Sequence, residues 1–149
     1  MTRLWRAGVV TALTLSSLLP TTLAAKPVAR SVPVPVMVGA EAELNACTSI
    51  GRAVGPKRAR AGLAAVRASP AATAPVIARL APGFLVWICE QKGGADHYGI
   101  VFGAASRSRG ADGLPPACGV NVPIAQPKAY RGPCRSGWIR TADIEAIAG

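Results

Sequence analysis

Short runs of apolar and β-branched residues, each bounded by Gly or Pro, follow one another along the middle of the chain. In chain order these runs are Leu63–Arg67, Val76–Leu80, Phe84–Glu90 and His97–Phe102, and a fifth, Gly137–Arg140, arrives much later. Runs of this length and composition predict strands. Their close succession predicts a small antiparallel barrel rather than a helical or α/β domain. We expect such a barrel to bind a ligand rather than to transform one.

The turns between these runs support the same interpretation. Pro82 and Gly83 suit the two central positions of a type II turn, and Lys92–Gly94 suits a hairpin turn. Phe84 and Trp87 are three residues apart in one strand. They therefore cannot both face one core unless the strand contains a bulge.

The first 24 residues have the pattern of a secretory signal peptide. Arg3 and Arg6 precede an apolar stretch over residues 7–19, and small residues lead to a cleavage position after Ala24. The alternative is an uncleaved membrane anchor, but the apolar run is shorter than the roughly 20 residues of a bilayer span. We expect no stable membrane span after cleavage, and an exported protein that is either periplasmic or secreted.

The chain has 149 residues and a formal net charge of +10. Removing the signal peptide leaves about +8, a charge that attracts anionic envelope polymers and phospholipid head groups. We expect no nucleic-acid partner, because the protein is exported and no dense basic run is interleaved with aromatic residues. The one basic cluster, Lys57–Arg60, is interpreted as a solvated loop.

All four cysteines lie after the signal peptide, and an even number in an exported chain predicts disulfides. A metal site is the alternative, but there is no C-x-x-C and the single His97 is remote from any paired cysteines. Three pairings are possible. We favour Cys118–Cys134, which closes a segment rich in Gly and Pro, and Cys47–Cys89, which ties the N-terminal arm to the sheet.

The remaining pattern divides the chain into an arm and one domain. The alternation of Pro and Val within residues 25–40 predicts an extended, polyproline-like backbone, and we assign residues 25–46 to an arm whose valines favour partial docking on the barrel. The domain covers residues 47–149, with an insertion at 103–136 that delays the last strand.

The order of the strand motifs resembles that of the bacterial SH3-like domain, SH3b or SH3 type 3, in its small exported single-domain subgroup. The segments that carry the resemblance are Ala65–Pro70, Val76–Gly83, Phe84–Glu90, Gly93–Val101 and Gly137–Ile139. The resemblance implies an all-β, SH3-like antiparallel barrel, here with a disulfide-pinned insertion before the last strand. Three features depart from the family pattern. Ala65 stands where Asn is common, Ala95–His97 stand where a Trp often follows the pair of glycines, and the insertion is long for the family.

No set of residues in the sequence predicts catalysis. Asp96 and His97 are neighbours on a strand edge and point to opposite faces, so we interpret His97 as an exposed turn histidine. Phosphate-loop, zinc-protease and nucleophile-elbow motifs do not occur. We therefore expect no enzymatic activity, no cofactor and no metal.

Aromatic and arginine side chains are the better candidates for ligand binding. They are Arg67, Tyr98, Tyr130, Trp138 and Arg140. For Trp138 we favour a role in supporting the core over contact with a ligand. For Tyr98 and Tyr130 we give these two roles equal weight. The arginines suit an anionic glycan or a peptide carboxylate, although ordinary surface charge is the simpler interpretation.

Two functions remain open. The preferred one is a non-enzymatic, exported SH3-like module that contacts a cell-envelope component, such as the glycan or peptide of peptidoglycan. The alternative is a protein–protein interaction or inhibitor module that presents the Cys118–Cys134 loop to an envelope protein.

Overall fold

The computed structural model describes residues 32–40, 42–56, 62–92, 94, 96–104 and 113–149. The predicted signal peptide 1–24, the first part of the arm and the Lys57–Arg60 cluster lie outside these residues. The described part of the chain contains no helix that is long and apolar enough to cross a membrane.

The five strands predicted above are present within a few residues of their expected bounds, and four further strands join them in the described part of the chain. The elements are β1 Met37–Val38, β2 Ser49–Ala53, β3 Ala64–Arg67, β4 Val76–Leu80, β5 Leu85–Lys92, β6 His97–Phe102, β7 Lys128–Ala129, β8 Arg135–Arg140, the 3-10 turn η1 Thr141–Asp143, and β9 Ile144–Ala148. The last residues of the chain thus add the strand β9 to the fold.

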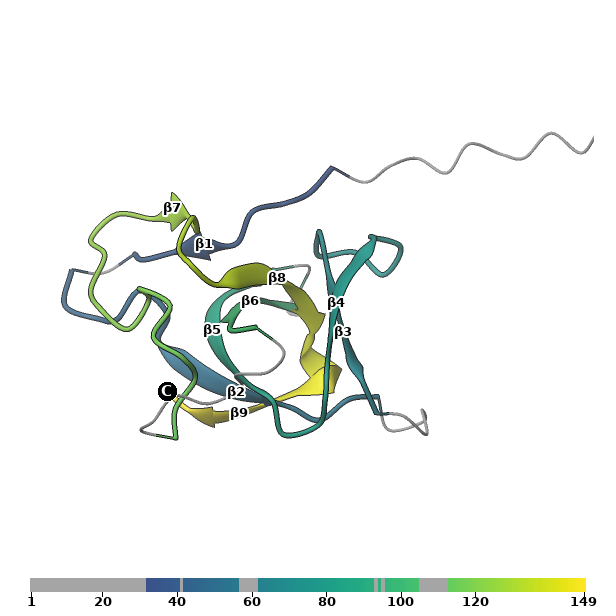
Figure 1. Cartoon of the computed structure of the whole chain (residues 1–149). Coiled ribbons are helices and arrows are strands. Elements are labelled where there is room, and N and C mark those ends of the chain that lie inside the picture. The colour runs from purple at the N-terminus through teal and green to yellow at the C-terminus, as the bar shows by residue number, and fades with distance from the viewer. Residues whose placement is uncertain (1–31, 41, 57–61, 93, 95, 105–112) are drawn as a thin grey trace, which may run out of the picture.

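Seven strands make one antiparallel sheet in the order β4-β3-β8-β6-β5-β2-β9. Figure 1 shows this sheet curving strongly, with β1 and β7 lying outside it. The late strand β8 sits between β3 and β6 near the middle of the order. The insertion therefore separates β8 from β6 in the sequence, although the two strands are neighbours in the sheet. The predicted all-β, antiparallel fold class with an insertion before β8 is confirmed.

The turn at Pro82 and Gly83 has the expected type II geometry. Gly83 has a φ of 85°, and the Phe84 amide donates to the Ala81 carbonyl at 3.1 Å. A residue with a side chain is strained at this φ, which explains the glycine.

The two faces of the sheet bury separate hydrophobic clusters. The inner cluster consists of Ala53, Ala64, Val66, Leu80, Phe84, Val86, Ile88, Ile100, Phe102, Ile139 and Ile144. The outer cluster consists of Val38, Ala46, Cys47, Trp87, Val101, Cys118 and Val120. Phe84 and Trp87 thus face opposite clusters, as their spacing predicts.

Both favoured disulfides are confirmed, and both belong to the outer layer. Cys47 pairs with Cys89 across 42 residues, and Cys118 pairs with Cys134 across 16 residues. In the chain-entropy model, loops of these lengths stabilise the fold by about 4 and about 3 kcal/mol. Two disulfides are also the pattern expected of an oxidising compartment.

The described part of the arm is docked on the sheet rather than free. The Val34 amide donates to the Ala68 carbonyl at 2.9 Å, and the Tyr130 amide donates to the Val36 carbonyl at 2.8 Å. Val36 is buried directly over Gly99, where an added Cβ would lie 3.1 Å from its Cγ1. The predicted partial docking is therefore extensive, and the arm forms part of the domain.

Candidate functional site

Three of the five predicted ligand residues lie on one face of the sheet. Trp138 on β8 is the Cα partner of both Arg67 on β3 and Gly99 on β6, while Arg140 is the partner of His97. Side chains two residues apart on a strand share a face. Arg67, Trp138, Arg140 and His97 therefore share the outer face, and Lys92 joins them as the other partner of His97.

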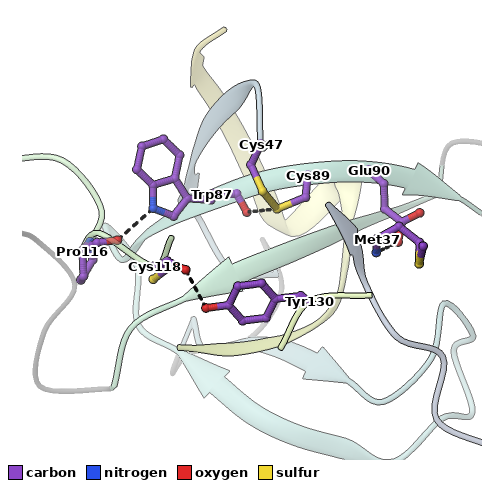
Figure 2. The surroundings of a disulfide bond; sticks show 8 residues. All are labelled: Met37, Cys47, Trp87, Cys89, Glu90, Pro116, Cys118 and Tyr130. Atoms are coloured by element: carbon purple, nitrogen blue, oxygen red, sulfur yellow. Dashed lines mark hydrogen bonds between the residues drawn. A yellow bond between two sulfur atoms is a disulfide. The ribbon is translucent and has the colours of Figure 1, made fainter. Parts of the chain in front are cut away.

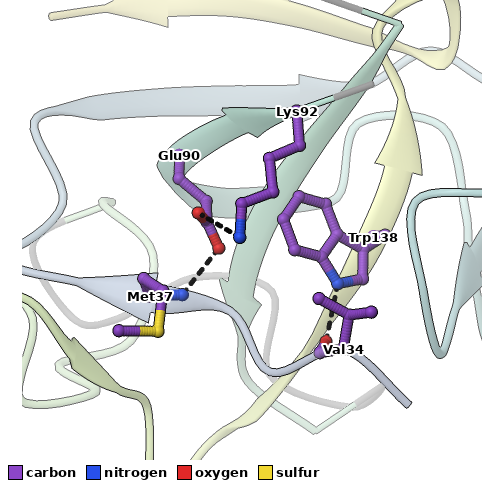
Figure 3. Close-up of polar contacts among 5 residues, drawn as sticks. All are labelled: Val34, Met37, Glu90, Lys92 and Trp138. Atoms are coloured by element: carbon purple, nitrogen blue, oxygen red, sulfur yellow. Dashed lines mark hydrogen bonds and ion pairs between the residues drawn. The ribbon is translucent and has the colours of Figure 1, made fainter. Parts of the chain in front are cut away.

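Trp138 is fully buried, and the arm is what covers it. Its Nε1 donates to the Val34 carbonyl at 2.7 Å, and the Lys92 Nζ lies 5.2 Å from the ring centroid (Figure 3). A buried indole N–H needs an acceptor, and here the arm supplies it. In this structure Trp138 supports the fold beneath the arm.

Glu90 connects the arm to this face. Its Oε1 accepts from the Met37 amide at 2.6 Å, and its Oε2 lies 3.2 Å from the Lys92 Nζ (Figure 3). The carboxylate thus anchors the arm through a charge-assisted hydrogen bond and holds the ammonium beside the Trp138 ring.

His97 is buried at 8% exposure, so the expectation of an exposed turn histidine is wrong. It opens β6 and points to the outer face, where β5 and β8 flank it. Burial lowers the pKa of its imidazole below the ordinary value, with the positive charges of Arg140 and Arg67 acting in the same direction and Asp96 opposing them. The ring is consequently neutral near pH 7.

The two arginines on this face, Arg67 and Arg140, differ in how they are held. The Arg67 guanidinium donates to the Ala74 carbonyl at 2.7 Å, which fixes it against the loop after β3. Arg140 is exposed and makes no ion pair with a described residue. Of the two, Arg140 is therefore the arginine available to a ligand.

Tyr98 lies apart from these residues. It follows His97 on β6, so its side chain points to the opposite face, where it packs half-buried against the inner cluster. The structure therefore does not bring Tyr98 together with Trp138 and the arginines.

Tyr130 lies in the insertion and holds the Cys118–Cys134 segment together. Its hydroxyl donates to the Cys118 carbonyl at 2.9 Å and accepts from the Cys134 amide at 3.0 Å. Figure 2 shows the ring pointing toward Cys118. Burial raises the pKa of the Tyr130 phenol, and the hydrogen bond from Cys134 partly opposes this.

Beside Tyr130 the insertion forms a hollow of about 320 Å³. Its lining combines apolar and cationic residues, including Val38, Ile124, Lys128, Arg131 and Pro133. Trp87 ties the start of this segment to the sheet, because its Nε1 donates to the Pro116 carbonyl at 3.0 Å (Figure 2).

Sequence reasoning did not select Lys128 or Arg131 as site residues, and it interpreted His97 as an exposed turn histidine. A usable signal was present for the first two, because residues 113–142 contain four cationic residues and no Asp or Glu. All four, Lys128, Arg131, Arg135 and Arg140, are exposed, and we refer to them as the cationic strip. For His97 no signal existed, since its burial accompanies a position between β5 and β8 that only the strand order creates.

The described residues hold no group of three His, Cys, Asp or Glu side chains that could bind a metal ion. Comparison with protein-family models, curated proteins and solved structures found no match. The SH3-like resemblance therefore stays a prediction from the sequence.

Proposed function

We propose that this protein is an exported, non-enzymatic SH3-like binding module that contacts an anionic cell-envelope polymer, most directly peptidoglycan. The observation that carries the proposal is the cationic strip, which leaves four exposed positive charges with no acidic residue between positions 113 and 142. The two disulfides agree with an oxidising envelope compartment.

The strip suits a polymer better than a small buried ligand. Its members come from the insertion and from both ends of β8, with Arg140 on the outer face and Arg135 on the face of the inner cluster, beside Phe102. Arg135 is held in place, since its guanidinium donates to the Ile77 carbonyl and lies 5.5 Å from the Phe102 ring centroid. A positive surface held by disulfides favours extended anionic chains by long-range attraction, with little ordering cost on binding.

Co-sedimentation with purified sacculi tests this function. We expect the protein to be retained at low salt and to be released progressively as the ionic strength rises, because exposed charges are screened. No retention at low salt would contradict the proposal.

The hollow beside Tyr130 favours a second candidate function, a protein–protein interaction or inhibitor module. A cavity lined by Val38, Ile124 and Pro133 and closed by a disulfide presents a rigid apolar surface with cationic edges. A photo-crosslinking residue at position 128 should then capture one discrete envelope protein, whereas the same residue at exposed position 79 on β4 should not. Equal capture at both positions would count against this candidate.

A further inference from the structure

A second hollow, of about 440 Å³, lies where β6 begins and β8 runs into η1. It is lined by Ala72, Asp96, His97, Arg140, Thr141 and Ala142. The Thr141 amide donates to the Asp96 carbonyl at 3.0 Å, so the chain segments on its two sides are fixed to one another. This hydrogen bond thus fixes the shape of the hollow at this end of the sheet.

The buried polar group in this lining is His97. Neither Nδ1 nor Nε2 of its ring has a hydrogen-bond partner among the described residues. Buried side-chain polar atoms nearly always have a partner, so an unpartnered imidazole at 8% exposure points to a group that enters from outside. A neutral imidazole can offer one N–H donor to such a group.

Arg140 and Thr141 add further donors on the same side. Arg140 is exposed and makes no ion pair within the described part of the chain. The Thr141 hydroxyl has only a long contact, 3.4 Å, to the Asp96 carbonyl. A guanidinium fork beside a hydroxyl and an imidazole N–H matches the two oxygens of a carboxylate.

Asp96 gives the hollow a selectivity that the cationic strip lacks. Asp96 and Arg140 both line this hollow, and the charges of these two exposed residues act on the His97 imidazole with opposite sign, so we refer to them as its negative and its positive rim. A polyanion or a free phosphate would meet the repulsion of Asp96. A ligand that carries an ammonium near its carboxylate would satisfy both rims.

We propose that this hollow binds the carboxylate of a zwitterionic ligand, a free amino acid or a short unblocked peptide, between Arg140, Thr141 and His97, with Asp96 receiving the ammonium. The assignment deepens the proposed function, on which it rests, because the peptide part of peptidoglycan contains free carboxylate and free amino groups. In this proposal, the end of β8 recognises short peptides, and the rest of the cationic strip attracts the anionic polymer over a longer range.

The only histidine of the chain makes the test direct, since one imidazole signal in a proton NMR spectrum reports on the site. The probes are the dipeptide alanyl-alanine, its N-acetylated form, its C-terminal amide and inorganic phosphate. We expect a saturable shift of the His97 signal with the dipeptide, weaker binding of the acetylated form, and no saturable shift with the amide or with phosphate.

Single substitutions at Arg140 and at Asp96 test the contributions of the two rims separately. Arg140→Gln should weaken dipeptide binding by about tenfold or more, whereas Arg79→Gln, an exposed control on β4, should leave it unchanged. Asp96→Asn should remove the preference for the dipeptide over its acetylated form while keeping carboxylate binding. An equal response of Arg140→Gln and Arg79→Gln would overturn the assignment.

The outcomes for this site and for the proposed function differ. No saturable dipeptide shift in a protein that sacculi retain would overturn the site and leave polymer binding standing. A saturable, Arg140-dependent shift in a protein that sacculi do not retain would support the site and reject polymer binding. Saturation by phosphate but not by the dipeptide would replace the zwitterion site with a simple anion site, and so would overturn the proposal.

Discussion

The indole nitrogen of Trp138 donates a hydrogen bond to the carbonyl oxygen of Val34, 104 residues earlier in the chain, at 2.7 Å. This bond joins the central strand β8 to the arm that crosses it, between Pro33 and Pro35. The arm thus occupies the surface over the ring in an intramolecular contact that resembles the docking of proline-rich peptides on aromatic grooves.

Trp138→Phe tests the importance of this bond. The substitution keeps a large buried ring but leaves the Val34 carbonyl without its donor, so we expect a loss of about 1–3 kcal/mol in the free energy of unfolding. Denaturant unfolding measures the loss, and limited proteolysis should detect earlier cleavage near residues 32–36. An unchanged cleavage pattern would mean that the buried Val36 and Val38 hold the arm by themselves.

The two disulfides should contribute comparable but separable stability. We expect the paired substitution of Cys118 and Cys134 by Ser to cost about 3 kcal/mol, and that of Cys47 and Cys89 about 4 kcal/mol. Urea unfolding measures both. The first pair should also perturb the near-ultraviolet signal of Trp87, whose Nε1 bonds to Pro116 in the same segment. If the Cys118–Cys134 variant kept full stability, the insertion would be held by Tyr130 and packing alone.

His97 should make the fold less stable in mild acid. Its pKa is lowered below 6.5 in the folded protein, so the unfolded chain takes up the proton more readily. The stabilisation is therefore complete above about pH 6.5 and is lost as the pH falls through the lower folded pKa.

Two measurements check this behaviour. An NMR titration of the single imidazole gives the folded pKa, and unfolding at a series of pH values gives the stability. His97→Gln should flatten the stability profile between pH 6.5 and the folded pKa. A folded pKa at or above 6.5 would contradict the account of His97.

Tyr130→Phe should loosen the insertion while leaving the sheet intact. The change removes the hydroxyl that bonds to both Cys118 and Cys134, so the Cys118 carbonyl and the Cys134 amide lose this partly buried partner. We expect a cost of about 1–3 kcal/mol. Hydrogen exchange should show faster exchange of the Cys134 amide, with the β5–β6 amides unaffected. Equal changes in both regions would indicate a global rather than a local effect.

The strands and the disulfides could be predicted because they depend on local and compositional signals. Alternation in β5 places Trp87 and Val86 on opposite faces, and a Gly/Pro-rich segment around Cys118 and Cys134 needs a covalent link. The candidate site could be predicted only in part, because its residues meet through strand order. Arg67, Trp138 and His97 become neighbours only when β8 inserts between β3 and β6. No short-range pattern encodes that insertion, and none encodes the burial of His97.

The central claim is that the cationic strip binds an anionic envelope polymer, and a charge-matched comparison on purified sacculi tests it most directly. Arg131→Gln with Arg140→Gln removes two charges from the strip. Arg52→Gln with Arg79→Gln removes two exposed charges from β2 and β4. The ion pair that is lost with them, between Arg52 and Glu145, is an exposed one that contributes little to stability. We expect the first double variant to lose retention at a salt concentration where the second is still held. Equal loss in both variants would show that net charge alone governs binding and would contradict the claim.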